Sequence, residues 1–409
     1  MEGGGGEGMW REAGGRVLGS KQAPLLGLNV DWESCLSELR PTAKELLALD
    51  VVIHLILHAR IYNRRGGLNG FSSLSMAYIL SVAGEPGRRV LQWLLGLKCV
   101  ECDNRYRKGD KALGYLLTRR ALGLGFSVKP MPPVIVERLG LHWQKRRRAT
   151  VKAGPAYAAQ WKCLQTVTLD PAIWPVLLQP TTGHDTAKTV HRILMAFHIE
   201  HRNWFFCHDE KTGRCFSNVS NFPSDLRQYL RIGGQQTREC DIVNSQPTLL
   251  CSLAYRACGE HPERDATLRL VRDGKFYSAL CGWAGKGDLP HKKQKRMVFA
   301  GVLFAKDHSR SELWPAVQER VPVMAGTITA AKLRGANALA LQLQKLEADI
   351  MLGRVFPRLT SLGIHGISLH DGCLVPSEHT TTAASVIAEE FAAVTGITPT
   401  VRIKDSAAA

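Results

Sequence analysis

The chain has 409 residues, which is long enough for two or three domains, and 45% of them are hydrophobic, as in an ordinary globular protein. A formal net charge of +17 predicts a polyanionic partner, nucleic acid before membrane, unless the surplus is only a solvated basic surface. The most apolar run, residues 46–59, is too short to cross a bilayer and carries Asp50, His54 and His58, so no membrane partner is expected.

The N-terminal residues and the cysteines indicate where the protein resides. Residues 1–28 are glycine-rich, lack the apolar core of a signal peptide, and are expected to form a disordered tail. The 11 cysteines are scattered and odd in number, which favours free thiols in a reducing compartment. Cys99 and Cys102 are interpreted as core or hairpin residues, with a metal site as the alternative. We therefore expect an intracellular, cytoplasmic, soluble protein.

Residues 29–185 are predicted to form a mostly helical, basic region that binds nucleic acid. Thr42 is a suitable N-cap for a helix that continues to about His58. Two further helices are expected from about Ser73 and from about Pro86, separated by a Gly-Glu-Pro-Gly turn. Two β-prone segments follow the second of these helices.

This order of elements is that of a winged helix-turn-helix, the alternative being a helical hairpin that only packs. In a winged helix-turn-helix the second helix would expose Arg88, Arg89 and Gln92. Arg88 and Arg89 are therefore candidate nucleic-acid-binding residues of the N-terminal region.

The C-terminal region, residues 186–409, contains two aspartates in related settings. In ECDIVNSQPTLLCSLAY (239–255), Asp241 ends a strand-like run and precedes a polar elbow and an apolar stretch with helical spacing. In GISLHDGCLVPS (366–377), the apolar spacing predicts a hairpin with Asp371 at its tip. Two aspartates at strand ends that meet in one sheet can hold two Mg²⁺ ions for phosphoryl transfer. The alternative is that both are turn or cap residues.

A basic helix is expected between the two aspartates. Asp288 as N-cap and Pro290 near the first turn are its start signals. Lys292, Arg296 and Phe304 are spaced in multiples of four and would lie along one face. Such a face can bind a triphosphate and stack on a base, whereas the alternative is a basic helix on the surface.

Five segments in order along the chain resemble motifs of the family A (DNA polymerase I-like) right-handed polymerases and of the related single-subunit phage-type RNA polymerases. They are KTGRCFSNVSNFP (211–223), DIVNSQPTLLCSLA (241–254), HKKQKRMVFAGVLFAK (291–306), QKLEADIM (344–351) and LHDG (369–372). The resemblance implies an α+β fold, a right-hand polymerase palm with a helical fingers insertion over residues 186–409. Residues 29–185 would supply a winged helix-turn-helix or a reduced thumb, and they carry no exonuclease signature.

The resemblance also implies a catalytic centre. Asp241, Asp371 and the backbone carbonyl of Ile242 would hold two Mg²⁺ ions, for which Mn²⁺ could substitute. His370, beside the second aspartate, would support the geometry of the primer end.

A larger set of residues would bind the nucleotide and the nucleic acid. The nucleotide-binding residues implied by the resemblance are Ser245, Gln246, Lys292, Lys295, Arg296 and Phe304, and those contacting the primer-template duplex are Arg214 and Gln344. The second basic residue of the family's helix is normally a lysine that protonates the leaving pyrophosphate. Because arginine does not readily release a proton, Lys295 and Arg296 both stay open for that role.

Gln246 bears on which polymer is made. DNA-making members of the family have glutamate at its position and RNA-making relatives have glycine, so the bulk of Gln246 favours deoxynucleotides. Its amide could also hydrogen-bond a 2′-hydroxyl. The expected protein is a monomeric DNA-directed DNA polymerase of a virus, plasmid or other mobile element, acting on primer-template and nucleoside triphosphates without proofreading. The alternatives are an RNA polymerase or primase on the same palm, and a non-catalytic helix-turn-helix regulator.

Overall fold

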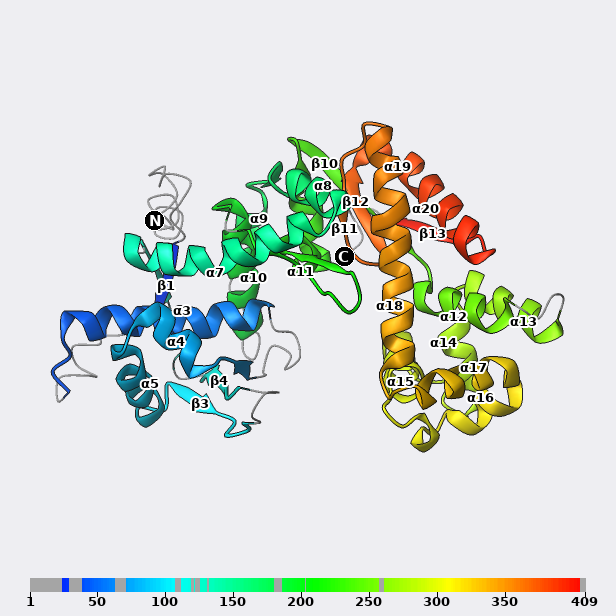
Figure 1. Cartoon of the computed structure of the whole chain (residues 1–409), viewed down its shortest axis with the longest axis horizontal. Helices are drawn as coiled ribbons and strands as arrows, with labels where there is room; N and C mark the ends of the chain where they lie inside the picture. Colours follow the sequence, from blue (N-terminus) through cyan, green and yellow to red (C-terminus); the bar gives the residue numbers. More distant parts are fainter. Residues whose placement is uncertain are drawn as a thin grey trace, which may run out of the picture. The chain divides into compact units, whose positions relative to one another are not determined.

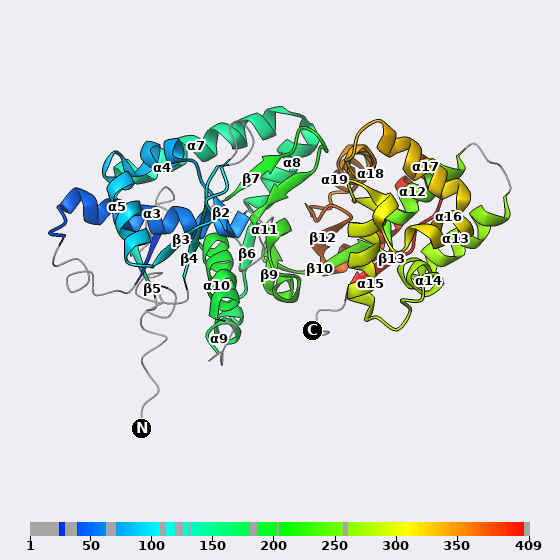
Figure 2. The same ribbon diagram turned by 90° about the horizontal axis from the view of Figure 1, so that it is seen from below.

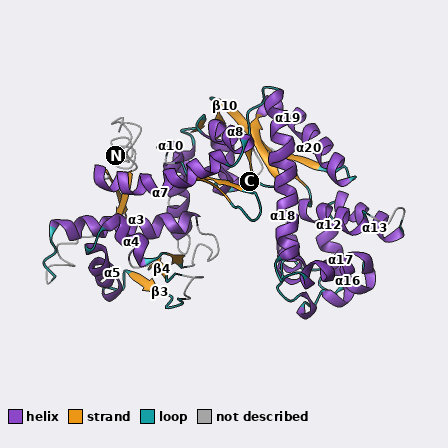
Figure 3. Ribbon diagram, in the orientation of Figure 1, coloured by secondary structure: helices purple, strands orange, loops and turns teal. Residues whose placement is uncertain are grey.

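The structure is a computed structural model that describes residues 24–28, 39–62, 71–106, 112–118, 121, 126–130, 132–179, 186–202, 204–256 and 261–404. Helices and short antiparallel strands are mixed throughout these residues (Figure 3). The chain forms two compact units. Unit 1 comprises residues 1–148, 171–205 and 221–223, and unit 2 comprises residues 149–170, 206–220 and 224–409.

Unit 1 combines helices with short strands. Its elements are β1 (Pro24–Leu28), α3 (Ala43–Tyr62), β2 (Ser72–Ser73), α4 (Met76–Ala83), α5 (Pro86–Gly96), β3 (Val100–Cys102), β4 (Gly114–Leu117), β5 (Phe126–Pro130), most of α7 (Pro133–Lys152), α9 (Ile173–Leu177) and α10 (Thr186–Glu200). Residues 24–28, assigned to the disordered tail from the sequence, pair as β1 with β5, and residues 1–23 lie outside the described residues.

Capping residues fix where helices α3 and α4 of unit 1 begin. Thr42 and Glu45 form a capping box at the start of α3, with the Thr42 N–H donating to Glu45 Oε2 at 2.8 Å and the Glu45 N–H donating to Thr42 Oγ1 at 3.3 Å. The predicted N-cap at Thr42 is therefore confirmed. The helix expected from Ser73 begins three residues later, because the Ser75 hydroxyl caps α4 by accepting from the Tyr78 N–H at 3.1 Å.

The predicted order of helix, turn, helix and hairpin is observed in unit 1 (Figure 1). Helix α5 follows α4 after a two-residue turn, and β3 and β4 form the antiparallel pair expected after it. Strand β2 pairs with the other side of β4, which gives the sheet order β2-β4-β3. The first helix, α3, packs against both α4 and α5.

Unit 2 contains one large sheet and a series of helices. Its strands and the short helices near them are α8 (Pro155–Leu164), β6 (Val167–Leu169), β7 (Phe206–His208), β8 (Cys215–Ser217), α11 (Asn218–Asn221), η2 (Ser224–Tyr229), β9 (Leu230–Ile232), β10 (Gln235–Ile242), β11 (Ile367–Ser368), β12 (Gly372–Pro376), η6 (Ser377–His379) and β13 (Val401–Lys404). Its other helices are α12 (Ser245–Tyr255), α13 (Pro262–Arg272), α14 (Phe276–Trp283), α15 (His291–Val298), η3 (Phe299–Leu303), η4 (His308–Arg310), α16 (Trp314–Arg320), α17 (Pro322–Leu333), α18 (Ala338–Ile350), η5 (Met351–Val355), α19 (Phe356–Ser361) and α20 (Thr380–Thr395).

Strand β10 is the centre of the large antiparallel sheet. The sheet order is β11-β12-β10-β9-β6, and β13 also pairs with β10. Helix α20 packs against β10, β12 and β13. Helices α12 to α17 follow β10 in the chain and gather at one end of the long helix α18, as both views of the ribbon show (Figures 1 and 2). The strand and helix predicted around Asp241 are confirmed as β10 and α12.

The compact units do not follow the boundary expected at residue 185. Residues 149–170 belong to unit 2, because β6 pairs with β9 and the Gln160 side chain holds β11. The Gln160 Nε2 donates to the Gly366 carbonyl at 3.0 Å, and its Oε1 accepts from the Ser368 N–H at 2.8 Å. Residues 186–205 belong to unit 1, where α10 packs against α3 and α9. Among the helices of the described ranges, none has both the length and the apolarity needed to cross a membrane.

Candidate active site

The two predicted aspartates lie at adjacent ends of paired strands in unit 2. Asp241, near the end of β10, is opposite Gly372 at the start of β12. The Ile242 N–H donates to the Asp371 carbonyl at 3.0 Å, and the Leu369 N–H donates to the Gly372 carbonyl at 2.9 Å, which closes the hairpin turn. The hairpin with Asp371 at its tip is therefore confirmed.

Glycine is required at position 372 for this approach. A Cβ atom there would lie 2.2 Å from the Cys240 carbonyl oxygen and 3.0 Å from the Asp241 Cα, both in the backbone of β10. Such contacts cannot be relieved by a side-chain rotation, so any other residue would push the turn away from β10. Gly372 thus allows the backbone next to Asp371 to lie directly against the backbone of Asp241.

The surroundings raise the pKa of both carboxyl groups. Burial, followed by the negative charges of Asp241 and Glu347, together raise the pKa of Asp371 to about 7. Burial also raises the pKa of Asp241, against which the positive charge of Lys404 acts. Two anions in a partly buried site favour a bound cation or a proton.

The donor set fits magnesium. Mg²⁺ is usually bound by one or two carboxylates, with the other positions taken by water and substrate phosphates. Asp241 and Asp371 supply that number of hard oxygen ligands. The described part of the chain contains no group of three or more His, Cys, Asp or Glu residues that could form a protein-only metal site.

Lys404 and Glu239 were not identified from the sequence. The Lys404 Nζ lies 3.3 Å from Asp241 Oδ2 and also forms an ion pair with Glu239, which is bound by Arg227 at 2.7 Å as well. Glu239 and Asp241 are two residues apart on β10, so they project from the same face of the sheet. The two-residue spacing of Glu239 and Asp241 could have been recognised in the sequence. The pairing with Lys404 could not, because β13 is about 160 residues further along the chain.

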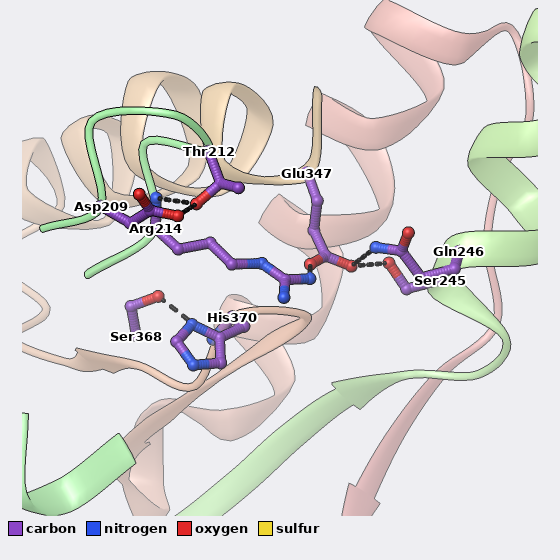
Figure 4. Close-up of polar contacts among 8 residues, drawn as sticks. All are labelled: Asp209, Thr212, Arg214, Ser245, Gln246, Glu347, Ser368 and His370. Atoms are coloured by element: carbon purple, nitrogen blue, oxygen red, sulfur yellow. Dashed lines mark hydrogen bonds and ion pairs between the residues drawn. The ribbon is translucent and has the colours of Figure 1, made fainter. Parts of the chain in front are cut away.

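Glu347 is a third residue that was not identified from the sequence, and it contacts three that were identified (Figure 4). Its fully buried carboxylate accepts from Ser245 Oγ at 2.5 Å and from Gln246 Nε2 at 2.8 Å, and forms an ion pair with Arg214. In the sequence, Glu347 could be noticed only as an acidic residue within QKLEADIM, a segment that otherwise favours a helix. Arg214, Ser245 and Gln246, predicted separately, are thus brought together around Glu347 of α18.

Two buried polar atoms of this cluster have no hydrogen-bond partner within the described residues. They are the Gln246 Oε1 and the Arg214 Nε. A carboxylate only accepts, so Glu347 fixes the Gln246 amide with its nitrogen inward and leaves the carbonyl oxygen as a buried acceptor. Gln246 is 7% exposed. Each of these unpaired buried atoms could be satisfied by a polar group of a ligand.

Arg214 and His370 are presented by two different turns (Figure 4). Arg214 follows a turn in which Thr212 Oγ1 donates to Asp209 Oδ2 at 2.8 Å, and which precedes β8. His370 has a φ of +78°, and its ring lies edge-on to that of Phe216 with centroids 4.8 Å apart. The hairpin tip and the β7–β8 turn therefore present these two side chains from different parts of the chain.

The basic helix α15 differs from its prediction at both ends. It begins at His291 with Pro290 as the N-cap residue, so Asp288 is not the cap. It ends at Val298 and continues as the π-helix η3 over Phe299–Leu303, which changes the residues per turn. Phe304 follows this turn and packs against Phe299, with ring centroids 5.0 Å apart. The predicted face of constant four-residue spacing therefore does not extend to Phe304.

Lys295 is the basic residue of α15 whose charge acts on the aspartates. It lowers the pKa of both Asp241 and Asp371, although burial outweighs this effect. Its Nζ lies 5.7 Å from the ring centre of Tyr277, whose own pKa is raised by burial and by the charge of Asp371. Lys292, Lys295 and Arg296 are all exposed, and of the three only Lys295 is among the main charges that act on the two carboxylates.

The remaining predicted residues are placed as follows. Gln344 is half-exposed on α18, one turn before Glu347. The N–H of Ile242 is used in the bond to Asp371, while its carbonyl as a metal ligand stays a prediction. Arg88 and Arg89 belong to unit 1.

No protein family model matches the chain, and no curated protein matches its sequence. Among solved structures, the chain is similar to the POL domain of Pol1 from M. smegmatis in complex with DNA primer-template and dNTP, with a TM-score of 0.38 and 14% sequence identity. The match covers 65% of this chain and 65% of that one. A TM-score this low carries no weight for fold or function, so a functional assignment depends on the residues of the chain itself.

Proposed function

We propose that the chain is a template-directed nucleotidyltransferase, a DNA polymerase of the family A type without proofreading. The observation that carries the proposal is the approach of Asp241 and Asp371 at the ends of β10 and β12, made close by Gly372. The ordered motifs of the sequence support it, because they place a buried polar cluster and a basic helix around that pair. A monomer acting on primer-template and nucleoside triphosphates is proposed with it.

Asp241 and Asp371 would hold two Mg²⁺ ions, which supply charge neutralisation for the triphosphate and activation of the primer hydroxyl when bound. The chain's own groups have distinct tasks. Lys295 would place a positive charge beside the triphosphate, with its ammonium able to give a proton to the departing pyrophosphate. Arg214 and His370 would position the primer end, and Lys292 would bind phosphate at the exposed start of α15.

Gln246 would lie against the sugar of the incoming nucleotide. Its bulk favours a deoxyribose, which supports DNA as the product, and its buried carbonyl oxygen is an acceptor that a 2′-hydroxyl could also use. An RNA polymerase or primase would use the same aspartates. A non-catalytic regulator gives no physical reason for two coupled carboxylates at paired strand ends.

The test is extension of a labelled primer on a template by the full-length protein, with deoxynucleotides, with ribonucleotides, and without primer, each with Mg²⁺ or a chelator. We expect Mg²⁺-dependent extension with deoxynucleotides. Asp241→Asn and Asp371→Asn should each lower it by roughly 10²–10⁴-fold, because each removes several kcal/mol of charge stabilisation in the transition state.

Asp265→Asn is the matched control, since Asp265 is an exposed aspartate on α13 of the same unit. It should extend primers like the wild type. Asp241→Asn, Asp371→Asn and Asp265→Asn should all bind primer-template nearly as tightly as the wild type does. Equal activity of Asp371→Asn and wild type would remove the proposed catalytic centre. Preference for ribonucleotides, or synthesis without primer, would move the protein to the RNA polymerase or primase alternative.

A further inference from the structure

The helix-turn-helix of unit 1 is built for close packing of its two helices. The turn between α4 and α5 consists of Gly84, with a φ of +75°, and Glu85. Gly87, in the first turn of α5, is buried, and a Cβ there would lie 2.9 Å from the Ala83 Cβ and 3.3 Å from the Ile79 Cγ2. Both glycines therefore set how α5 leaves α4, which fixes the direction of α5 relative to the rest of the unit.

Arg89 connects α5 with α3. Its guanidinium lies 3.0 Å from Glu45 Oε1, in the capping box of α3, and 5.1 Å from the ring centre of Trp93. Its side chain is still 62% exposed, so the nucleic-acid-binding role expected for Arg89 stays a prediction.

Arg88 and Gln92 form the outward face of α5. Both are exposed, and because they are four residues apart they lie one above the other on the same side of the helix. Within the described residues, neither side chain takes part in a hydrogen bond or ion pair. Their chemistry is informative, because arginine pairs bidentately with guanine and glutamine with adenine in the major groove.

The β3–β4 hairpin lies beside α5 in the sequence and packs against it. Asp103 Oδ1 fixes the base of its loop by accepting from the N–H groups of Arg105 at 3.0 Å and of Gly114 at 2.8 Å. Tyr106, in the same loop, is 64% exposed. Residues 85–120, which span α5 and the hairpin, contain nine Lys or Arg and four Asp or Glu, so this part of the chain suits a polyanion.

We propose that unit 1 binds duplex DNA with α5 in the major groove, where Arg88 and Gln92 read base edges, and with the β3–β4 hairpin against the flanking backbone. An α-helix of about 10–12 Å diameter fits a major groove of about 12 Å. The first residues of the second helix of a helix-turn-helix are those that reach bases. This site is separate from the primer-template site of unit 2 and gives the chain a preferred double-stranded sequence.

The experiment uses the full-length Asp241→Asn protein, so that no synthesis occurs. A pool of blunt DNA duplexes with a randomised centre is selected for binding in the presence of excess unlabelled primer-template, which occupies unit 2. We expect one sequence to be enriched. Arg88→Ala and Gln92→Ala should each weaken binding to it by roughly 5- to 140-fold, and each should relax selection at one base position.

Arg310→Ala is the matched control, because it removes the same charge from an exposed position in unit 2. It should bind the selected duplex like the parent protein. All variants should show unchanged melting temperatures, since the replaced side chains are exposed. The proposal is overturned if no sequence is enriched, if Arg88→Ala and Gln92→Ala bind the selected duplex as tightly as the parent, or if double-stranded RNA of the same sequence binds equally well.

The result is independent of the polymerase assignment. Duplex selection by a protein that does not extend primers would leave this proposal standing and the polymerase proposal refuted. Primer extension by a protein that selects no duplex would support the polymerase proposal and refute the proposal that unit 1 reads duplex DNA.

Discussion

Among the described carboxyl groups, Asp371 is the one whose pKa is most altered by its surroundings. Burial is the main cause, and Asp241 and Glu347 add negative charge, so the pKa of Asp371 rises from 3.8 to about 7. A carboxyl group with a raised folded pKa binds its proton more tightly in the folded chain than in the unfolded chain. Without metal, the contribution of Asp371 to the free energy of unfolding therefore falls as the pH rises from about 4 through about 7, and it is then constant.

Magnesium should reverse that loss of stability. Below about pH 7 the ion must displace the proton of Asp371, whereas above it the carboxylate is already charged, so the rise in Tm caused by millimolar Mg²⁺ should be larger at about pH 8 than at about pH 6. Thermal unfolding with and without Mg²⁺ at both pH values measures this. Asp371→Asn should lose the pH dependence of the Mg²⁺ effect. An equal rise in Tm at both pH values would show that Asp371 is not a metal ligand.

Glu347 is a fully buried anion whose main charge partner is Arg214, itself mostly buried. Removing either partner leaves a charge without its counterpart, which costs about 3–5 kcal/mol of the free energy of unfolding. We expect Glu347→Ala and Arg214→Ala each to have that effect in urea unfolding. The double variant should lose less than their sum, with a coupling of about 0.5–3 kcal/mol.

The exposed pair Lys286 and Glu312, 2.9 Å apart, provides the comparison. Lys286→Ala should change the free energy of unfolding by less than about 1 kcal/mol, because exposed ion pairs are weak. Additive losses from Glu347→Ala and Arg214→Ala would contradict the contact.

At the scale of elements, the π-helix η3 decides which residues of the basic helix can act together. Because α15 ends at Val298, the face that contains Lys295 is separated from Phe304 by a turn of different pitch. Lys295, over Tyr277 and Phe299, is the residue directed to the carboxylates. Lys292 and Arg296 are exposed, as Lys295 is, but neither is among the main charges that act on the two carboxylates.

This placement distinguishes two adjacent basic residues. Lys295→Ala should lower kcat for extension by roughly 10²–10⁴-fold, as for loss of a general acid, whereas Arg296→Ala should mainly raise KM for the nucleotide. Lys295→Arg keeps the charge but not the transferable proton, so it should restore binding and not kcat. Single-turnover kinetics measure these effects. A larger loss of kcat in Arg296→Ala than in Lys295→Ala would reverse the assignment.

Elements set by local sequence were predictable, and contacts between distant segments were not. Thr42 capped α3 as expected, the hairpin of Asp371 formed where the β-prone spacing and glycine indicated, and helix followed strand after Asp241. Lys404 and Glu347 escaped prediction because their roles arise from pairing across the sheet and between helices. A lone lysine on a strand, or a lone acid on a helix, has no local signature of such a partner.

At the scale of the whole molecule, the most distinctive property is the excess of positive charge. The 53 Lys and Arg outnumber the 36 Asp and Glu, and several acids of unit 2, among them Glu239, Glu347 and Asp241, are engaged by internal basic groups. Basic side chains that remain exposed, such as Arg88 in unit 1 and Lys292 in unit 2, can therefore meet phosphates. Binding to nucleic acid through both units requires such a surface, and a solvated basic surface without a partner is the alternative.

Salt dependence separates these two explanations. Each phosphate neutralised on a duplex releases counterions, so log K should fall with log salt with a slope of about −0.9 per contact. If the chain makes about 6–10 contacts, affinity for primer-template should fall by roughly 10³–10⁵-fold between about 50 and 200 mM salt. Fluorescence anisotropy across that range measures the slope, and Asp265→Asn, which removes one exposed negative charge, should leave it unchanged. A slope near zero would mean that the +17 surplus is only solvated and that phosphate contacts do not drive association.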